Sequence, residues 1–287
     1  MAIVYDKLLA LKIPDVERTY SVRDPIFYAL SLGLGQDPVN ADELPFCFEK
    51  GVKVLPTFPV VVAQPGMWAR DLDTGIDWVK IVHGEHDLVI HKQLPASGTV
   101  TSTTRVIEVI DKGPGKGALI ISQRKVQDKA TGELYATITQ TTFARGDGGF
   151  GGPPRPSPVP HALPERAPDT VCDLPTRPEM ALIYRWNADM NPLHADPEIA
   201  KRAGFPRPIL HGLATFGVAG HAILKTMCDY DPARFKSMAG RFSAPVYPGE
   251  TIRTEMWRDG SIVSFRLRLV ERDVIVLNNG RAEISSA

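Results

Sequence analysis

The sequence predicts an α+β fold in two halves, each an antiparallel sheet wrapped around helix, with a proline-rich linker between them. Alternating, β-branched segments occur in both halves, and the second half also contains one long apolar segment rich in glycine and alanine. The stretch between the halves is dense in proline and glycine. The length of 287 residues also suits about two domains.

The first half, residues 1–147, is predicted to form a curled antiparallel sheet. A short helix is expected at 25–33, with Asp24 as N-cap, Pro25 in the first helical position and Gly33 as the stop. Strand-like segments separated by glycine- and proline-rich turns follow at 85–94, 98–111, 117–128 and 134–145. This half shows no long central helix as clear as the one in the second half.

Residues 148–178 are expected to be a linker, because few large apolar side chains occur among their many prolines and glycines. Proline at this density favours an extended, polyproline-like backbone. We therefore expect a semi-rigid strap along the surface rather than a flexible tether.

The second half, residues 179–287, is predicted to wrap a sheet around a buried helix. A short helix at 196–204 has Asp196 as its cap, proline at its start and Gly204 at its end. The helix at 211–228 is apolar on nearly all sides, so it must be buried. Strands are expected near 238–244, 251–259, 261–271 and 273–282.

Composition argues against several classes of partner. The 33 basic and 33 acidic residues cancel, so nothing in the net charge calls for nucleic acid or a membrane surface. Cys47, Cys172 and Cys228 lie far apart without CxxC spacing, which argues against a disulfide framework or a zinc site. We find no signal peptide, no membrane-spanning run and no C-terminal Ser-Lys-Leu, so a cytoplasmic location is expected.

The stretch 184–194, YRWNADMNPLH, places a carboxylate at Asp189, an amide at Asn191 and an imidazole at His194. Pro192 fixes its own φ and disfavours helical geometry at Asn191, which predicts a stiff loop. A carboxylate and an imidazole held on a stiff loop suit proton transfer. From residue types alone, a polar loop with an Asx turn and a helix cap is an equal alternative.

This stretch resembles the signature of the MaoC-like, R-specific enoyl-CoA hydratases, an aromatic and a small residue followed by Gly-Asp-x-Asn-Pro-aliphatic-His. Ala188 stands at the glycine position of that pattern and has less φ freedom. Segments 43–46, 55–58, 82–86, 148–152, 210–213 and 241–249 extend the resemblance to the two-repeat hydratase unit of peroxisomal multifunctional β-oxidation enzymes. It implies a double hotdog fold with a catalytic C-terminal repeat, an N-terminal repeat that accommodates the acyl chain, and homodimerisation.

The resemblance implies a hydro-lyase of fatty-acid metabolism that interconverts a trans-2-enoyl-CoA and a (3R)-3-hydroxyacyl-CoA without a metal or other cofactor. Hydration delivers hydroxide to C3 and a proton to C2, so one water must be held by groups that accept and donate protons. Asp189 and His194 are expected to hold that water and Asn191 to orient it. Gly212 opens the buried helix, where its N–H can stabilise negative charge on the thioester oxygen.

Four further residues match substrate-binding positions of the family: His83, Gly84, Lys112 and Phe242. Alternative interpretations remain for three of them. His83 and His86 could be a metal pair, but no third ligand with suitable spacing is nearby. Lys112 could reach the phosphates of coenzyme A or be a solvated turn lysine, and Phe242 could be a core aromatic.

Other functions remain alternatives to enoyl-CoA hydration. They are dehydration of a 3-hydroxyacyl-carrier-protein or of a bulky, steroid-type acyl-CoA, and non-catalytic binding of acyl thioesters. Thioesterase activity is disfavoured because residues 211–228 contain no carboxylate. His211 and His221, on the same apolar helix, are expected to be satisfied core histidines.

Overall fold

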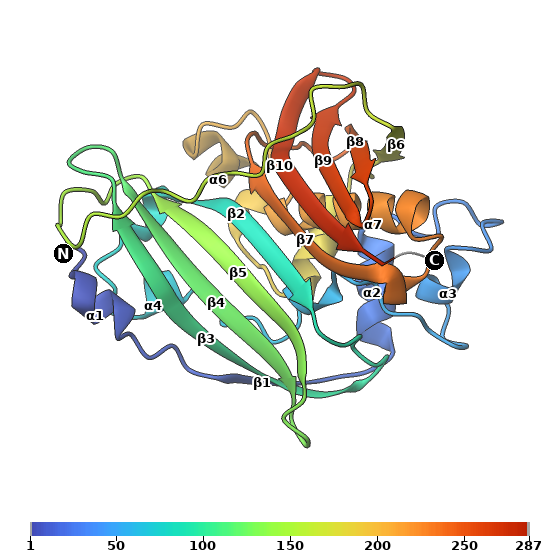
Figure 1. The fold of residues 1–287 in the computed structure, drawn as a ribbon, viewed down its shortest axis with the longest axis horizontal. Coiled ribbons are helices and arrows are strands. Elements are labelled where there is room, and N and C mark those ends of the chain that lie inside the picture. The colour runs from blue at the N-terminus through green and yellow to red at the C-terminus, as the bar shows by residue number, and fades with distance from the viewer. Residues whose placement is uncertain (1, 286–287) are drawn as a thin grey trace.

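The computed structural model describes residues 2–285, whose strands form one antiparallel sheet (Figure 1). Its ten strands follow the order β1-β3-β4-β5-β2-β7-β10-β9-β8-β6, so each half of the chain supplies five neighbouring strands. β2 pairs with β7 where the halves meet. The two sheets expected from the sequence are therefore joined edge to edge, which leaves neither central edge unpaired.

The strands of the first half largely follow the predicted segments. They are β1 (Val16–Tyr20), β2 (Ile81–Ile90), β3 (Gly98–Asp111), β4 (Ala118–Asp128) and β5 (Leu134–Ala144). The last three agree with prediction within one residue. β2 begins and ends four residues earlier than expected. A register shift between His83 and Glu85 breaks the side-chain alternation near its start.

The helices of the first half are short. They are α1 (Tyr5–Leu9), α2 (Arg23–Ser31), α3 (Leu44–Cys47) and α4 (Trp68–Asp71), with 3₁₀ turns η1 (Phe58–Val60) and η2 (Trp78–Lys80). The prediction that Asp24 is the N-cap of α2 is wrong. Asp24 lies inside the first turn, where its carboxylate accepts a hydrogen bond from the Ser21 N–H at 2.8 Å.

No long helix lies within the first half of the sheet among residues 2–285. The irregular segment 54–63, which contains η1, is buried there instead. Arg124 on β4 donates to carbonyl groups of this segment. In the first half, the sheet therefore packs against a buried irregular segment and not against a central helix.

The second half wraps its strands around α7 (Gly212–Met227), which contacts β6, β7, β8 and β10. The strands are β6 (Thr170–Pro175), β7 (Phe235–Phe242), β8 (Thr251–Asp259), β9 (Ile262–Leu269) and β10 (Val274–Ile284). Glycine allows a close approach on α7, because a Cβ at Gly220 would lie 2.5 Å from Thr57 Cγ2. The buried helix thus packs against both its own sheet and the first half.

Short helical segments connect the linker to α7. They are α5 (Met180–Tyr184), η3 (Arg185–Asn187), η4 (Pro192–His194) and α6 (Pro197–Arg202), and η5 (Pro232–Arg234) follows α7. Asp196 caps α6 as predicted, since its carboxylate accepts from the Glu198 N–H at 2.8 Å. No helix within residues 2–285 has both the length and the apolar character needed to cross a membrane.

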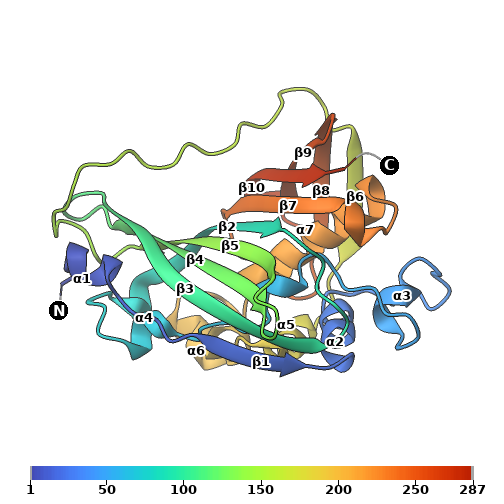
Figure 2. The same cartoon turned by 60° about the horizontal axis from the view of Figure 1, so that its bottom comes forward.

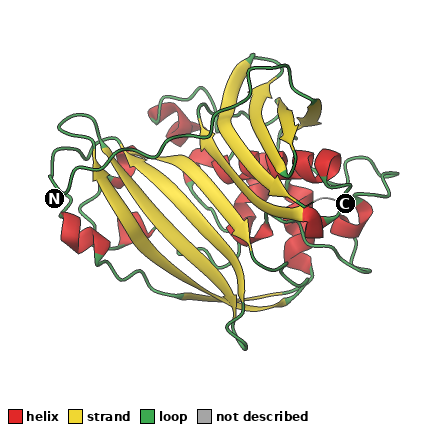
Figure 3. Ribbon diagram, in the orientation of Figure 1, coloured by secondary structure: helices red, strands yellow, loops and turns green. Residues whose placement is uncertain are grey.

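The proline-rich stretch crosses the side of the sheet opposite the main group of helices (Figures 2 and 3). Residues 148–168 carry no helix or strand and are mostly exposed, whereas β6 lies within the predicted linker range 148–178. His161 attaches the stretch to the sheet: its carbonyl accepts from Asn279 Nδ2 at 2.8 Å, and its Nε2 lies 2.8 Å from Ser264 Oγ.

Candidate active site

A cavity of about 1230 Å³ lies between the two halves of the chain. Both halves line it. From the second half come Asp189, Asn191, His194, Gly212 and Phe242, and from the first half comes His83. Six of the eight residues proposed from the sequence therefore border the same space.

The loop between η3 and η4 is held in shape by its own polar groups. The Asp189 carboxylate accepts from the Asn191 N–H, and Asn191 Oδ1 accepts from the Leu193 N–H, both at 3.0 Å. Arg185 Nη2 donates to the Met190 carbonyl at 2.9 Å. The Asx turn and the helix cap weighed as an alternative are thus present, and they position side chains that also face the cavity.

His194 is 8 % exposed, and its Nδ1 lies 2.8 Å from the Ile209 carbonyl. A carbonyl only accepts, so Nδ1 carries the proton in the neutral ring and Nε2 keeps a lone pair. Burial lowers the pKa of His194 despite the nearby Asp189 carboxylate. The ring is therefore neutral near pH 7 and can accept a proton through Nε2.

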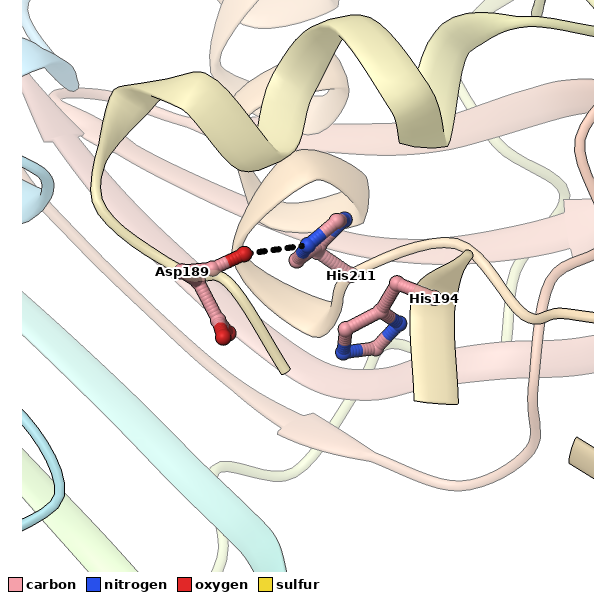
Figure 4. Close-up of side chains that lie close together, drawn as sticks. All are labelled: Asp189, His194 and His211. Carbon is pink, nitrogen blue, oxygen red and sulfur yellow. Dashed lines mark hydrogen bonds between the residues drawn. The ribbon is translucent and has the colours of Figure 1, made fainter. Parts of the chain in front are cut away.

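His211 belongs to this cluster and is not a fully satisfied core histidine. Its ring stacks on that of His194 with centroids 3.7 Å apart, and its Nε2 donates to the Asp189 carbonyl at 3.2 Å (Figure 4). Its Nδ1 is buried without a partner in the described part of the chain. His221, by contrast, lies in the core, with Nε2 3.2 Å from Tyr230 Oη.

Asp189, His194 and His211 each offer one ligand atom, and these atoms lie within 4.8 Å of one another. A carboxylate and two imidazoles can bind a metal ion. The same groups suit direct proton transfer, because His211 already uses Nε2 to hold the Asp189 backbone and His194 has a defined tautomer.

Gly212 is the first residue of α7, where a backbone N–H has no acceptor within the helix. A Cβ on Gly212 would lie 3.3 Å from the Phe242 ring, so the aromatic ring packs directly over this helix start. His83 also packs against Phe242, with the two ring centroids 4.7 Å apart. These residues form one wall that faces the Asp189–His194 loop.

Gly84 and Lys112 are not among the residues that line the cavity. Gly84 lies at the β2 register shift, where a Cβ would be 3.1 Å from the Thr141 carbonyl oxygen, so it permits close strand packing. Lys112 lies beyond β3, and its Nζ donates to Ser157 Oγ of the exposed strap at 3.2 Å. The structure gives neither residue a contact with the site.

Sequence reasoning missed the arginines that line the cavity. Arg70, Arg145 and Arg202 are exposed and therefore mark its mouth, whereas Arg124 is only 6 % exposed. No motif identifies the three at the mouth. The inward position of Arg124 could have been predicted, because it lies an even number of residues from Ile120 and Val126 and therefore shares their buried face of the strand.

Ala188, directly before Asp189, adopts φ 131° and ψ 10°. This φ lies in the region where glycine is favoured, so the departure from the glycine of the family pattern leaves a strained backbone.

Two family matches together span most of the chain. Residues 19–146 match the MFE-2 hydratase 2 N-terminal domain, and residues 160–280 match the MaoC like domain. The boundary between the matches falls in the proline-rich stretch.

Among curated proteins, the chain is 39 % identical to the peroxisomal enoyl-CoA hydratase 2 of Arabidopsis thaliana, over 95 % of this chain and 93 % of that protein. Among solved structures, it resembles a MaoC-like dehydratase from Phytophthora capsici with a TM-score of 0.87 and 34 % identity, covering 99 % and 98 % of the two chains. A conserved hypothetical protein of Mycobacterium tuberculosis, described as a double hotdog, matches with a TM-score of 0.57 and 15 % identity over 99 % and 98 %. The expected double hotdog fold is confirmed.

Proposed function

Because this chain belongs to the MaoC-like, two-repeat enoyl-CoA hydratase family, we propose that it adds one water to a trans-2-enoyl-CoA to give a (3R)-3-hydroxyacyl-CoA in fatty-acid metabolism. The observation that carries the proposal is the convergence of Asp189 and His194 on one cavity that also contains the N-terminus of α7. The 3R hand follows from the family and not from the geometry.

In the proposed reaction one water is held between the Asp189 carboxylate and His194 Nε2. The water oxygen bonds to C3, and the C2–C3 π pair moves onto the thioester as an enolate. The proton released from the water passes to Asp189 or His194, and C2 then takes a proton as the enolate collapses. The atoms of one water are thus divided between C3 and C2.

Each neighbouring group has a defined part in this proposal. The Gly212 N–H stabilises the negative thioester oxygen, and the positive end of the α7 dipole adds to that effect. Asn191 orients the loop through its bond to the Leu193 N–H. His211 positions Asp189 by holding the carbonyl of that residue.

The mouth of the cavity suits coenzyme A. The thioester carries phosphate groups at its coenzyme A end, and the exposed guanidinium groups of Arg70, Arg145 and Arg202 line this opening. We expect these side chains, and not Lys112, to contact the phosphates within one copy of the chain. Roles for Lys112 and Gly84 in substrate binding stay predictions from the family pattern.

Dehydration is the reverse of this reaction, so a dehydratase of carrier-protein thioesters or of steroid-type acyl-CoA uses the same site. A non-catalytic binding module is a weaker proposal, because it has no need for a neutral imidazole with a free Nε2 beside a carboxylate.

Homodimerisation and a cytoplasmic location stay predictions. Light scattering checks the first, and fractionation of the source cells checks the second.

The test is loss of the enoyl thioester absorbance in the presence of wild type, Asp189→Asn and His194→Ala. We expect each variant to lose roughly two to four orders of magnitude in kcat. Asp196→Asn is the matched control, because it changes a nearby capping carboxylate that does not line the cavity. A chelator should leave the wild-type rate unchanged. Hydration at close to the wild-type rate by both site variants would refute the mechanism.

A further inference from the structure

The wall of the cavity contributed by the first half contains polar side chains beside the apolar Val60, Ile120 and Ile138. His86, Gln140 and Ser122 are paired across β2, β5 and β4 in one row of the sheet. Thr104 and Arg124 are paired in the adjacent row of β3 and β4. All five side chains line the cavity. His86 already bonds to His83, Gln140 to Thr142 and Arg124 to backbone carbonyl groups. Beside a plain hydrocarbon chain, the charge of Arg124 would be the feature of this wall left uncompensated.

Arg124 is the charged member of this wall and is 6 % exposed. Its Nη1 donates to the Val62 carbonyl at 2.6 Å, and its Nη2 donates to the Val60 and Pro59 carbonyls at 2.8 and 3.2 Å. Burial lowers the pKa of Arg124 to about 10, so the side chain remains charged at neutral pH. No carboxylate pairs with it within residues 2–285.

Carbonyl groups satisfy donors of the guanidinium but leave its net charge uncompensated. The bonds of Arg124 use only Nη1 and Nη2, and Nε makes none within the described residues. Thr104 Oγ1, across the ladder from Arg124, and His86 Nε2 are also buried without partners in that part of the chain. Both atoms have almost no accessible surface, so what this wall presents to the cavity is the cation of Arg124, which lacks a counter-charge.

This polar wall lies away from the reacting carbons. His83 is close to the catalytic loop, and its Nε2 is 3.2 Å from His86 Nδ1. Arg124 stands two strands further along the sheet, on β4, and four residues along that strand from Ile120, which lies in the row of His83. At the usual strand spacing and rise, this corresponds to roughly 16 Å. A chain that starts at the Asp189–His194 loop and passes His83 would reach Arg124 with its distal end.

We propose that Arg124 binds an anionic group at the far end of the acyl chain, so that the preferred substrates are 2-enoyl-CoA thioesters whose chain ends in a carboxylate. The inference rests on the proposed hydratase function and adds the substrate class. A carboxylate supplies the missing negative charge and accepts a hydrogen bond from the Nε–H. A terminal methyl group offers neither.

The experiment compares three trans-2-enoyl-CoA series of graded, matched chain length that end in a carboxylate, its methyl ester or a methyl group. We expect wild type to show an optimal length at which kcat/KM for the carboxylate exceeds that for the ester and the methyl group by about 10-fold or more. Equal or lower values for the carboxylate at every length would overturn the inference, while hydration of the methyl-ended series would preserve the proposed function. No hydration of any series would overturn both.

Two variants separate recognition from folding. Arg124→Met removes the charge, and we expect the carboxylate preference to fall by about 10- to 100-fold with little change for methyl-ended chains. Arg124→Lys keeps the charge and should retain part of the preference even where the bonds to segment 59–63 are weakened. Parallel losses for both chain ends in both variants would assign Arg124 a structural role only, contrary to the proposal. The wild-type comparison decides the question even where Arg124→Met does not fold.

Discussion

Replacing Ala188 with glycine should stabilise the protein, although most alanine-to-glycine changes destabilise. Ala188 is held at φ 131° and ψ 10°, where a side chain strains the backbone by about 1–3 kcal/mol. Glycine removes that strain, but it loses more conformational entropy on folding than alanine does, which lowers the free energy of unfolding by about 0.5–1 kcal/mol. The expected net gain in the free energy of unfolding is therefore about 1 kcal/mol.

Thermal unfolding followed by circular dichroism measures this change, which corresponds to a rise in Tm of about 2–4 °C for a protein near this size. Ala203→Gly is the matched control. Ala203 ends α6 with φ −81°, so glycine there only increases unfolded-state freedom and should lower Tm. A fall in Tm of similar size for both variants would show that the Ala188 backbone carries no relievable strain.

Two further predictions concern the buried histidines and the start of α7. Burial lowers the pKa of His83 to about 4 and that of His86 well below its usual value. Unfolding lets both rings take up protons, so stability is complete above about pH 6.5 and falls by roughly 1 kcal/mol per pH unit for each such ring towards pH 4. Urea titrations between pH 7 and pH 4 check this, and a flat profile would contradict it. For Gly212→Ala, the added Cβ would lie 3.3 Å from the Phe242 ring, and overpacking of about 1–3 kcal/mol should lower kcat/KM by roughly tenfold or more. Phe242→Leu should restore part of that loss in steady-state assays, and an unchanged rate in the single variant would refute the close contact.

Local patterns in the sequence were sufficient to predict many elements. The alternation over 98–111 matches β3, and the apolar segment 211–228 contains α7. Asp196 caps α6 as its residue type and position predict. These features depend on residues only a few positions apart, so the sequence of one strand or one helix is enough to predict them. Short elements such as β1 and β6 escaped prediction because their partners lie far away along the chain.

The residues proposed for proton transfer are likewise concentrated in one segment, since Asp189, Asn191 and His194 share a loop that Pro192 stiffens. The stack of His211 on His194, 17 residues later in the chain, needed the tertiary structure. Lys112 shows the opposite outcome, because the turn after β3 directs it to the strap and away from the cavity.

The sequence by itself determined the long strands of the first half, the buried helix, the loop that carries Asp189, Asn191 and His194, and the membership of a family. The tertiary structure alone decided that β2 and β7 join the two sheets, that three exposed arginines line the cavity and that an uncompensated Arg124 lies inside it. The physical reason is range. Caps, turns and side-chain periodicity act over a few residues, whereas a cavity is made by groups that only the pairing of distant strands brings together.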